Sequence, residues 1–527
     1  MARLKTGLWL FSALLVARLF TGAAFAEDTG LAGFPQPDWA TATPEEEGMD
    51  SAALAKLVAM GKAMRFDSLL ITRHGRIVLD ASYAPYSADQ LHIVNSSTKA
   101  VVATLIAMLL KDGTLDSLDH PVLDLFKDRK IDNVDARKQA LTVQHLLNMT
   151  AGFDWDEGYN GGAETSLYEM GRSPDWVQYI LDRPMAHAPG ETFYYNSGNS
   201  HLLSAIVTKL TGKSADDFAK ERLFGPLGIT EHAWFKDAQG ISSGGFGLAL
   251  KPRDMAKIGY LYLRGGRWGA QPLLPPDWIE AVNHATVSMN ATFDPGLRYA
   301  DQFWALPDAN VFMAVGYHCQ VIMVQPGRDI VAVMTARDFC PFRKVANAIA
   351  GTVTSDSGLP AAPDAAAALA EAVRAAATEA RGPVGAVPDI AAAISGRTYS
   401  FPPGPLGINT IKLDLIGADP QVTWDIPSRD RSGGTVHLQS PIGLDGLYRK
   451  TAPPNPWQPF VYRAMKGSWV DATTFAIDVQ FIGQGEERNW RLSFDGDKVT
   501  FRTKGRYGKD VAVEGRAETS VQLGFRR

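Results

Sequence analysis

Cysteine is scarce in this sequence, since Cys319 and Cys340 are the two present among 527 residues. They lack the spacing of zinc ligands, and no His-Glu-x-x-His occurs, so a metal site has no support and no cofactor is expected. No Gly-x-Ser-x-Gly elbow joins a predicted strand to a helix, which argues against an α/β-hydrolase. Basic clusters are also missing, and 52 basic against 57 acidic residues give a net charge of −5. Nucleic acid and anionic membrane surfaces are therefore not expected as partners.

Apolar runs long enough to cross a bilayer are lacking in the mature chain. The one notable apolar stretch near the start, Leu8–Ala17, is preceded by Arg3 and Lys5 and followed by Ala24-Phe25-Ala26. This order is typical of a secretory signal peptide with a small-residue cleavage site. We predict a signal peptide at residues 1–26, cleavage after Ala26, and a periplasmic or secreted mature protein without a membrane span.

The remaining chain divides by composition into three parts. A hairpin at 67–80, strands at 311–315, 319–324 and 330–335, and helical segments between 121 and 254 predict an antiparallel sheet with helices beside it, in a domain spanning 37–354. Residues 355–390 form an Ala/Pro-rich linker, and its helix at 365–380 is expected to dock weakly because its apolar face is mostly methyl groups. Short alternating runs over 391–527 predict a smaller all-β accessory domain.

Ser96 and Lys99 stand where an apolar run of helical length, Ala100–Leu110, begins. Positions i and i+3 share one face of a helix, so the Ser96 hydroxyl and the Lys99 amine are expected within hydrogen-bond reach. Burial lowers the pKa of a lysine, and a neutral amine accepts a serine proton. Ser96 is therefore the candidate nucleophile, and its own backbone N–H a candidate oxyanion donor. The alternative for such a serine is a helix N-cap.

A tyrosine-rich turn, Phe193–Asn199, supplies the second candidate element. A phenol between a lysine cation and a serine has a lowered pKa, which makes Tyr194 a candidate proton shuttle. Asn196 offers both an amide donor and an acceptor to a substrate. The alternative is a turn that is rich in Tyr, Asn and Gly for conformational reasons alone.

A glycine at the end of a predicted strand opens the third element, Gly316-Tyr317-His318-Cys319-Gln320. Glycine lets the backbone approach a ligand closely, so the N–H of Tyr317 is the candidate second oxyanion donor. His318 is a candidate substrate contact, with an exposed or core-satisfied histidine as the alternative.

Together these elements resemble the serine β-lactamase and penicillin-binding superfamily. Ser96–Lys99 matches its Ser-x-x-Lys, Tyr194–Asn196 matches its Tyr-x-Asn, and Gly316–Gln320 falls where the family has a Lys-Thr-Gly or Gly-x-x-Gly-Gln strand. The likeness covers about residues 40–350. It implies an α+β fold, in which an antiparallel sheet is flanked by helices and accompanied by an all-helical region, and hydrolysis through an acyl-enzyme on Ser96.

Two departures from the family pattern bear on the substrate. Ala314 stands where β-lactamases carry the lysine that helps hold the β-lactam carboxylate, so efficient penicillin hydrolysis is not expected, and Cys319 replaces the glycine before Gln320. The stretch Asn148–Tyr159 resembles the 6-aminohexanoate-dimer hydrolase branch, which cleaves amides and esters, and adds Tyr159 as a candidate substrate-binding residue.

We therefore predict an exported serine hydrolase that cleaves an amide or ester bond of a small molecule or short peptide, with Ser96, Lys99 and Tyr194 as catalytic residues. The alternatives are a D-peptidase or penicillin-recognising cell-wall enzyme, and a non-catalytic binding protein on the same fold. No oligomeric state is predicted.

An exported chain also offers its two cysteines an oxidising environment. Counting from the Pro326-Gly327 turn, Cys319 lies near the start of one hairpin strand and Cys340 just past the end of the other. We expect a disulfide between them, which stabilises a loop of this size by about 3 kcal/mol.

Overall fold

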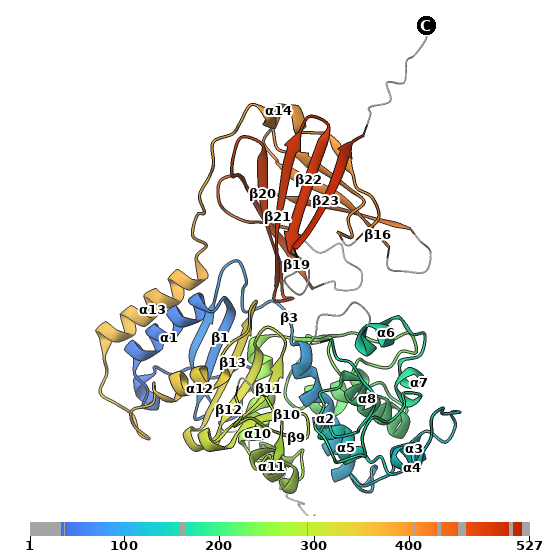
Figure 1. Cartoon of the computed structure of the whole chain (residues 1–527). Helices are drawn as coiled ribbons and strands as arrows, with labels where there is room; N and C mark the ends of the chain where they lie inside the picture. The colour runs from blue at the N-terminus through green and yellow to red at the C-terminus, as the bar shows by residue number, and fades with distance from the viewer. Residues whose placement is uncertain are drawn as a thin grey trace, which may run out of the picture.

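The computed structural model describes residues 33–518 except 36, 159–164, 292–293, 405, 429–433, 452–459 and 505–509. In these residues the chain forms two large antiparallel sheets, one within residues 66–336 and the other within 398–517, with a helical segment leading from one to the other (Figure 1). The predicted signal peptide lies outside the described residues. Within the described ranges, no helix combines the length and apolarity needed to span a bilayer.

The first sheet has eight strands in the order β2-β1-β13-β12-β11-β10-β9-β8. Residues from the two ends of the domain meet in its second and third strands, because β1 pairs with β13 over Phe66–Arg73. The predicted hairpin and all three later strands are found within one or two residues of their expected bounds. The strands are β1 (Phe66–Arg73), β2 (Arg76–Ser82), β8 (Val287–Ser288), β9 (Arg298–Ala300), β10 (Phe303–Leu306), β11 (Val311–Gly316), β12 (Gln320–Gln325) and β13 (Ile330–Ala336).

Both faces of this sheet are buried by helices. Successive side chains of a strand point to opposite faces, so Leu70 packs in one apolar core while Leu69 and Ile71 pack in the other. The second core is covered by α1 (Ser51–Ala63), α12 (Phe342–Ala350) and α13 (Pro363–Ala377), and the first by α2 (Thr98–Lys111), α10 (Pro252–Leu263) and α11 (Pro276–Asn283). The predicted fold class, an antiparallel sheet flanked by helices, is confirmed.

A helical region extends the first core beyond the sheet, on the side of α2 (Figure 1). Short strands join it to the body of the domain: β3 (His92–Ile93), β4 (Ala233–Trp234) and β5 (Leu248–Leu250) form one small sheet, and β6 (Arg267–Trp268) and β7 (Gln271–Pro272) another. Its helices are α3 (Val122–Leu125), α4 (Ala136–Gln139), α5 (Val143–Leu147), α6 (Ser166–Arg172), α7 (Trp176–Leu181), α8 (Ser197–Thr211) and α9 (Ala215–Ala219), the last continued by a π-helical turn at Lys220–Phe224.

The helix of the predicted linker docks more firmly than its composition suggests. Helix α13 packs beside α1, and its Leu369 and Ala376 are buried in the second core. The carbonyl of Ala376 also accepts the backbone N–H of Ala84 at 3.0 Å. The small methyl groups of α13 allow a close approach to α1, which compensates for the little area that each buries. The domain boundaries at 354/355 and 390/391 stay predictions.

The C-terminal part is all-β, as predicted, after a short helix α14 (Ile390–Ile394). Its ten strands follow the order β17-β16-β15-β14-β23-β22-β21-β20-β19-β18. The sheet curls toward closure, since Arg463 on β19 donates to the carbonyl of Gln439 on β17. The strands are β14 (Thr398–Ser400), β15 (Thr410–Asp414), β16 (Gln421–Pro427), β17 (Thr435–Pro441), β18 (Arg449–Thr451), β19 (Tyr462–Trp469), β20 (Thr474–Ile482), β21 (Glu486–Asp495), β22 (Lys498–Lys504) and β23 (Asp510–Ala517).

The turn between β20 and β21 contacts the first half of the chain near β3 (Figure 1). The carbonyl of Gly483 accepts the N–H of Ile93 at 2.6 Å. Gly485 lies so close that a Cβ there would be 2.6 Å from the carbonyl oxygen of Ala336. Glu487 forms ion pairs with Arg65 and Arg337. This turn therefore joins the C-terminal sheet to the first one, and apolar contacts such as that of Val461 with Leu91 add to the attachment.

Candidate active site

Ser96 lies in a single 3-10 turn, Asn95–Ser97, directly before α2. The side chain of Ser97 donates to the carbonyl of Gln320 at 2.7 Å, and that of Thr98 donates to the carbonyl of Asn95 at 2.7 Å. These bonds fix the turn to β12. Ser96 stays partly exposed while Ser97 and the start of α2 are buried, so the turn presents the Ser96 hydroxyl to solvent at the end of a buried helix.

Lys99 lies one helical turn after Ser96 and is 1% exposed. Its Nζ donates three hydrogen bonds, to Ser96 Oγ at 3.1 Å, to Ser197 Oγ at 3.0 Å and to the carbonyl of Gly245 at 2.7 Å. Burial lowers the pKa of Lys99 to about 8, although the nearby charge of Glu157 acts in the opposite direction. The amine is therefore held against Ser96 Oγ, and its burial favours the neutral form.

The tyrosine next to this pair is Tyr195, not the expected Tyr194. The ring of Tyr195 lies 4.7 Å from Lys99 Nζ, and its hydroxyl hydrogen-bonds with the Ser96 side chain. Burial raises the pKa of Tyr195 well above its usual value. Tyr194 is 43% exposed, and the nearby Asp156 adds to the effect of burial in raising its pKa. Its backbone N–H donates to the carbonyl of Met149 at 2.8 Å.

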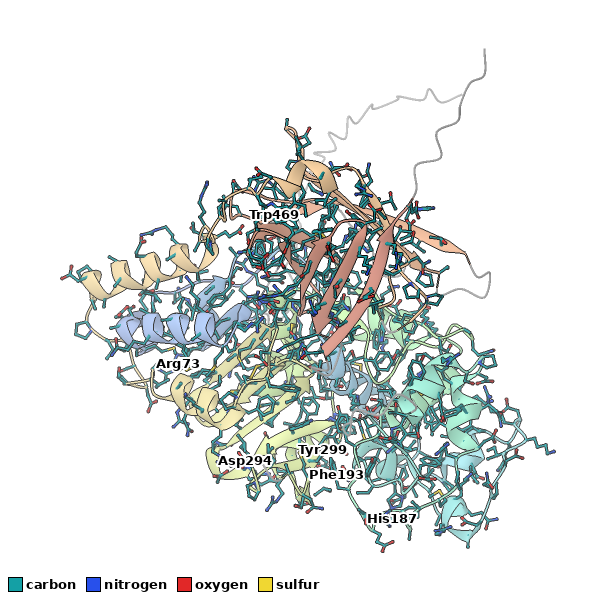
Figure 2. The ribbon with its side chains drawn as sticks, turned by 45° about the horizontal axis from the view of Figure 1, so that its top comes forward. Arg73, His187, Phe193, Asp294, Tyr299 and Trp469 are labelled. Atoms are coloured by element: carbon teal, nitrogen blue, oxygen red, sulfur yellow. A yellow bond between two sulfur atoms is a disulfide. The ribbon has the colours of Figure 1, made fainter. Side chains whose placement is uncertain are left out.

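Aromatic packing selects which tyrosine turns inward. Figure 2 labels Phe193 and Tyr299, whose rings lie side by side with centroids 5.2 Å apart. Tyr195 packs edge-on against Tyr299 at 6.5 Å and against Trp304 at 6.3 Å. In an extended segment alternate side chains share a face, so anchoring Phe193 on β9 directs Tyr195 toward the same side and Tyr194 away. This alternation was the signal in the sequence that could have identified Tyr195.

Asn196 does not take the substrate-binding role expected of it, and Ser197, for which no role was predicted, contacts the active-site lysine. Asn196 is 2% exposed and is the N-cap of α8, with its Oδ1 accepting the N–H groups of Gly198 at 2.7 Å and Asn199 at 3.2 Å. This oxygen is used by the helix and does not face a substrate. Ser197, the next residue, contacts Lys99 instead. Its hydroxyl donates a very short hydrogen bond to Glu157, a carboxylate that was not among the predicted site residues.

The backbone at the end of β11 passes directly over the nucleophile turn. A Cβ on Gly316 would lie 2.2 Å from the carbonyl oxygen of Val94, so only glycine allows this approach. The side chain of Asn95 then donates to the carbonyl of Tyr317 at 3.0 Å. Ser96 and Tyr317, the two predicted oxyanion residues, are therefore brought onto neighbouring segments. Ala314, inside β11, is buried and supplies no charge.

A disulfide braces the turn that follows β11. Cys319 and Cys340 are bonded, as predicted. His318 and Cys319 both have left-handed backbone conformations, with φ of 60° and 63°, which non-glycine residues rarely adopt. The covalent link therefore holds a strained turn next to Tyr317.

His318 contacts both the accessory sheet and the ring of Tyr317. Its Nδ1 lies 2.9 Å from the carbonyl oxygen of Gly485, and its ring stacks on that of Tyr317 at 3.9 Å. The surfaces that remain open beside it belong to Tyr317, 37% exposed, and Phe339, 63% exposed. Both rings are more exposed than His318, which is partly buried. Tyr159, the other predicted substrate-binding residue, lies outside the described residues.

One serine pattern of α/β-hydrolases does occur by letter, at Gly240-Ile241-Ser242-Ser243-Gly244. Ser242 is fully buried, and its hydroxyl accepts the backbone N–H of Asp216 at 3.0 Å. No strand-to-helix elbow surrounds it, because the segment runs through turns and bridges to β5. This serine supports the structure and offers no rival nucleophile.

The chain is similar to known proteins in both sequence and structure. The sequence model of the Beta-lactamase family matches residues 52–352. The 6-aminohexanoate-dimer hydrolase of Paenarthrobacter ureafaciens is 24% identical over 287 residues, which cover 51% of this chain and 71% of that protein. A protein of Escherichia coli O157:H7 named "Putative D-alanyl-D-alanine carboxypeptidase" is 28% identical over 177 residues, which cover 33% of this chain and 38% of the relative.

Among solved structures, the "Putative 6-aminohexanoate-dimer hydrolase from Bacillus anthracis" superposes with a TM-score of 0.52 at 21% identity. The superposition covers 62% of this chain and 90% of that one. This likeness establishes a shared fold over that part of the chain. The family match ends before the C-terminal sheet.

Proposed function

The chain belongs to the beta-lactamase family, and from that membership we propose that it is an exported serine hydrolase acting through an acyl-enzyme on Ser96. The observation that carries the proposal is the buried Lys99 amine, 3.1 Å from Ser96 Oγ and hydrogen-bonded to two further acceptors. A lysine in this position has a lowered pKa, and in its neutral form it accepts the serine proton.

In the proposed acylation step, Ser96 Oγ attacks a substrate carbonyl while Lys99 takes the Ser96 proton. The N–H groups of Ser96 and Tyr317 stabilise the tetrahedral oxyanion. Tyr195 then passes a proton to the departing amine or alcohol, taking over the role that the sequence alone assigned to Tyr194, and Lys99 restores the proton of Tyr195. Water repeats the cycle against the ester of Ser96, which releases the acid and the free enzyme.

We propose an amide or ester of a small molecule or short peptide as substrate. A neutral Ala314, where β-lactamases have a lysine, leaves no cation at that place for a β-lactam carboxylate. The exposed rings of Tyr317 and Phe339 favour a substrate with an apolar group beside the scissile bond. Export is supported by the Cys319–Cys340 disulfide, since such bonds persist in oxidising compartments.

The test uses labelling together with turnover. A fluorophosphonate probe should label the wild type and not Ser96→Ala, and a screen of aryl esters, short linear amides, D-Ala peptides and nitrocefin should find turnover that the variant abolishes. Turnover of esters or linear amides without nitrocefin cleavage supports the proposal. Efficient labelling by a fluorescent penicillin would favour the D-peptidase reading instead, and full activity in Ser96→Ala would refute the nucleophile.

A further inference from the structure

The Glu157 carboxylate is linked to the Lys99 amine through a single hydroxyl group, that of Ser197. Ser197 Oγ accepts from Lys99 Nζ at 3.0 Å and donates to Glu157 Oε1. The other carboxylate oxygen of Glu157 accepts the N–H of Ser197 at 2.9 Å and the indole N–H of Trp155 at 2.7 Å. A continuous chain of hydrogen bonds therefore runs from Glu157 through Ser197 and Lys99 to Ser96 Oγ.

The segment that carries Glu157 is fitted closely to the first turn of α8. Trp155 is 5% exposed, and a Cβ on Gly198 would lie 3.0 Å from its ring. The glycine after Ser197 thus makes room for the indole that holds Glu157 in place. Both oxygens of the carboxylate are used by donors of fixed position, so its location relative to Lys99 is set by the fold and does not depend on a flexible side chain.

We propose that Glu157 is a positioning residue for the hydrolase reaction, which holds the Lys99 amine against Ser96 through the Ser197 hydroxyl and supplies the negative charge opposite that amine. The inference rests on the proposed function, because it assumes that Lys99 takes the Ser96 proton.

Burial and the charge of the partner shift the pKa values of Lys99 and Glu157 in opposing directions. Burial lowers the pKa of Lys99, and the Glu157 charge raises it again; burial likewise raises the pKa of Glu157, while Lys99 and the hydrogen bonds lower it. We infer that Glu157 is charged, since its two oxygens accept three hydrogen bonds, from the backbone and hydroxyl of Ser197 and from the Trp155 indole. Besides Glu157, the titratable group facing Lys99 is Tyr195, and Asp156 faces the loop near Tyr194. Gly245 contributes only a carbonyl.

Replacing Glu157 by glutamine keeps the shape and removes the charge. Without its counter-charge, Lys99 loses its proton more easily, so the pH at which Ser96 becomes nucleophilic should fall by about 1–3 units. The maximal rate should fall as well, because a weaker base takes the serine proton less readily. A residue that only supported the loop would lower the rate without shifting this pH dependence.

The experiment measures the rate of fluorophosphonate labelling from pH 5 to 10. The final extent of labelling per protein molecule gives the fraction of folded active sites. Glu157→Gln should lower the midpoint, which is the pH at which the labelling rate reaches half of its maximum. Glu157→Asp keeps the charge and should recover the wild-type midpoint, with part of the rate. Asp154→Asn is the matched control, since this carboxylate lies on the same loop with its side chain 61% exposed and its ion pair to Arg183 at 3.6 Å, and its midpoint should not change.

Ser197→Ala supplies a second test should Glu157→Gln fail to fold. It removes an acceptor of the charged amine, so its midpoint should also fall. The proposal is overturned if Glu157→Gln or Ser197→Ala retains the wild-type midpoint, or if Asp154→Asn shifts it equally. These outcomes are distinct from failure of the proposed function, in which Ser96→Ala is still labelled or the wild type is not labelled at all.

Discussion

Replacing Tyr195 by phenylalanine distinguishes the role of this tyrosine from that of its neighbour Tyr194. The change removes one hydroxyl from a ring that Tyr299 and Trp304 hold in place, so the packing is preserved. Because that hydroxyl hydrogen-bonds with Ser96 and is proposed to pass the proton to the leaving group, we expect kcat to fall about 10²–10⁴-fold. This corresponds to about 3–5 kcal/mol of transition-state stabilisation. The free energy of unfolding should change by only about 1 kcal/mol, the net value of one hydrogen bond.

The assay is hydrolysis of a p-nitrophenyl ester, normalised by active-site titration, with urea unfolding as the measure of stability. Tyr194→Phe is the matched control, because it removes the same hydroxyl from the neighbouring, 43% exposed side chain. We expect the control to stay within about twofold of the wild type, as for most surface substitutions. If Tyr194→Phe lost more activity than Tyr195→Phe, the assignment of the proton shuttle from packing would be wrong.

Three further outcomes follow from the structure. Wild-type kcat/KM should rise about tenfold per pH unit up to about pH 8 and then level off, because only neutral Lys99 accepts the serine proton; a flat profile from pH 6 to 9 would contradict this. Cys340→Ser should lower the free energy of unfolding by about 3 kcal/mol in urea titrations, and dithiothreitol should bring the wild type to the same value. Gly485→Ala should reduce activity and stability more than Gly496→Ala, since both glycines have positive φ but only a Cβ at 485 meets the first sheet; equal losses would show that backbone strain alone is responsible.

Much of the fold could be predicted because it depends on local patterns. The alternation of apolar residues located β11, β12 and β13, and the apolar run after Ser96 located α2. What the sequence did not indicate was the docking of α13 on α1, since a face of alanines carries little signal of a specific partner. That contact depends on how closely two helices approach, which is a property of the assembled fold.

The site was predictable where its residues are neighbours in sequence and not where they meet through tertiary packing. Ser96 and Lys99 are one helical turn apart, so spacing alone brought them together. Tyr194 and Tyr195 fit a proton shuttle equally well by residue type, and rings from β9 and β10 decide between them. Glu157 is distant in sequence from both Lys99 and Ser197, so its role becomes visible only once α2, α8 and the loop before α6 are placed in space.

The accessory sheet contacts the active-site region through a turn that meets two of its segments. Its turn between β20 and β21 accepts hydrogen bonds from Ile93, three residues before the nucleophile, and from His318, the residue after the proposed oxyanion donor. Each such bond contributes about 1 kcal/mol, too little to hold the two parts together alone, but Glu487 adds ion pairs with Arg65 and Arg337. Because the two bonds attach to the two segments whose relative position sets the oxyanion geometry, we expect a disturbance of this turn to lower kcat as well as stability. The accessory sheet is then part of the framework of the active site.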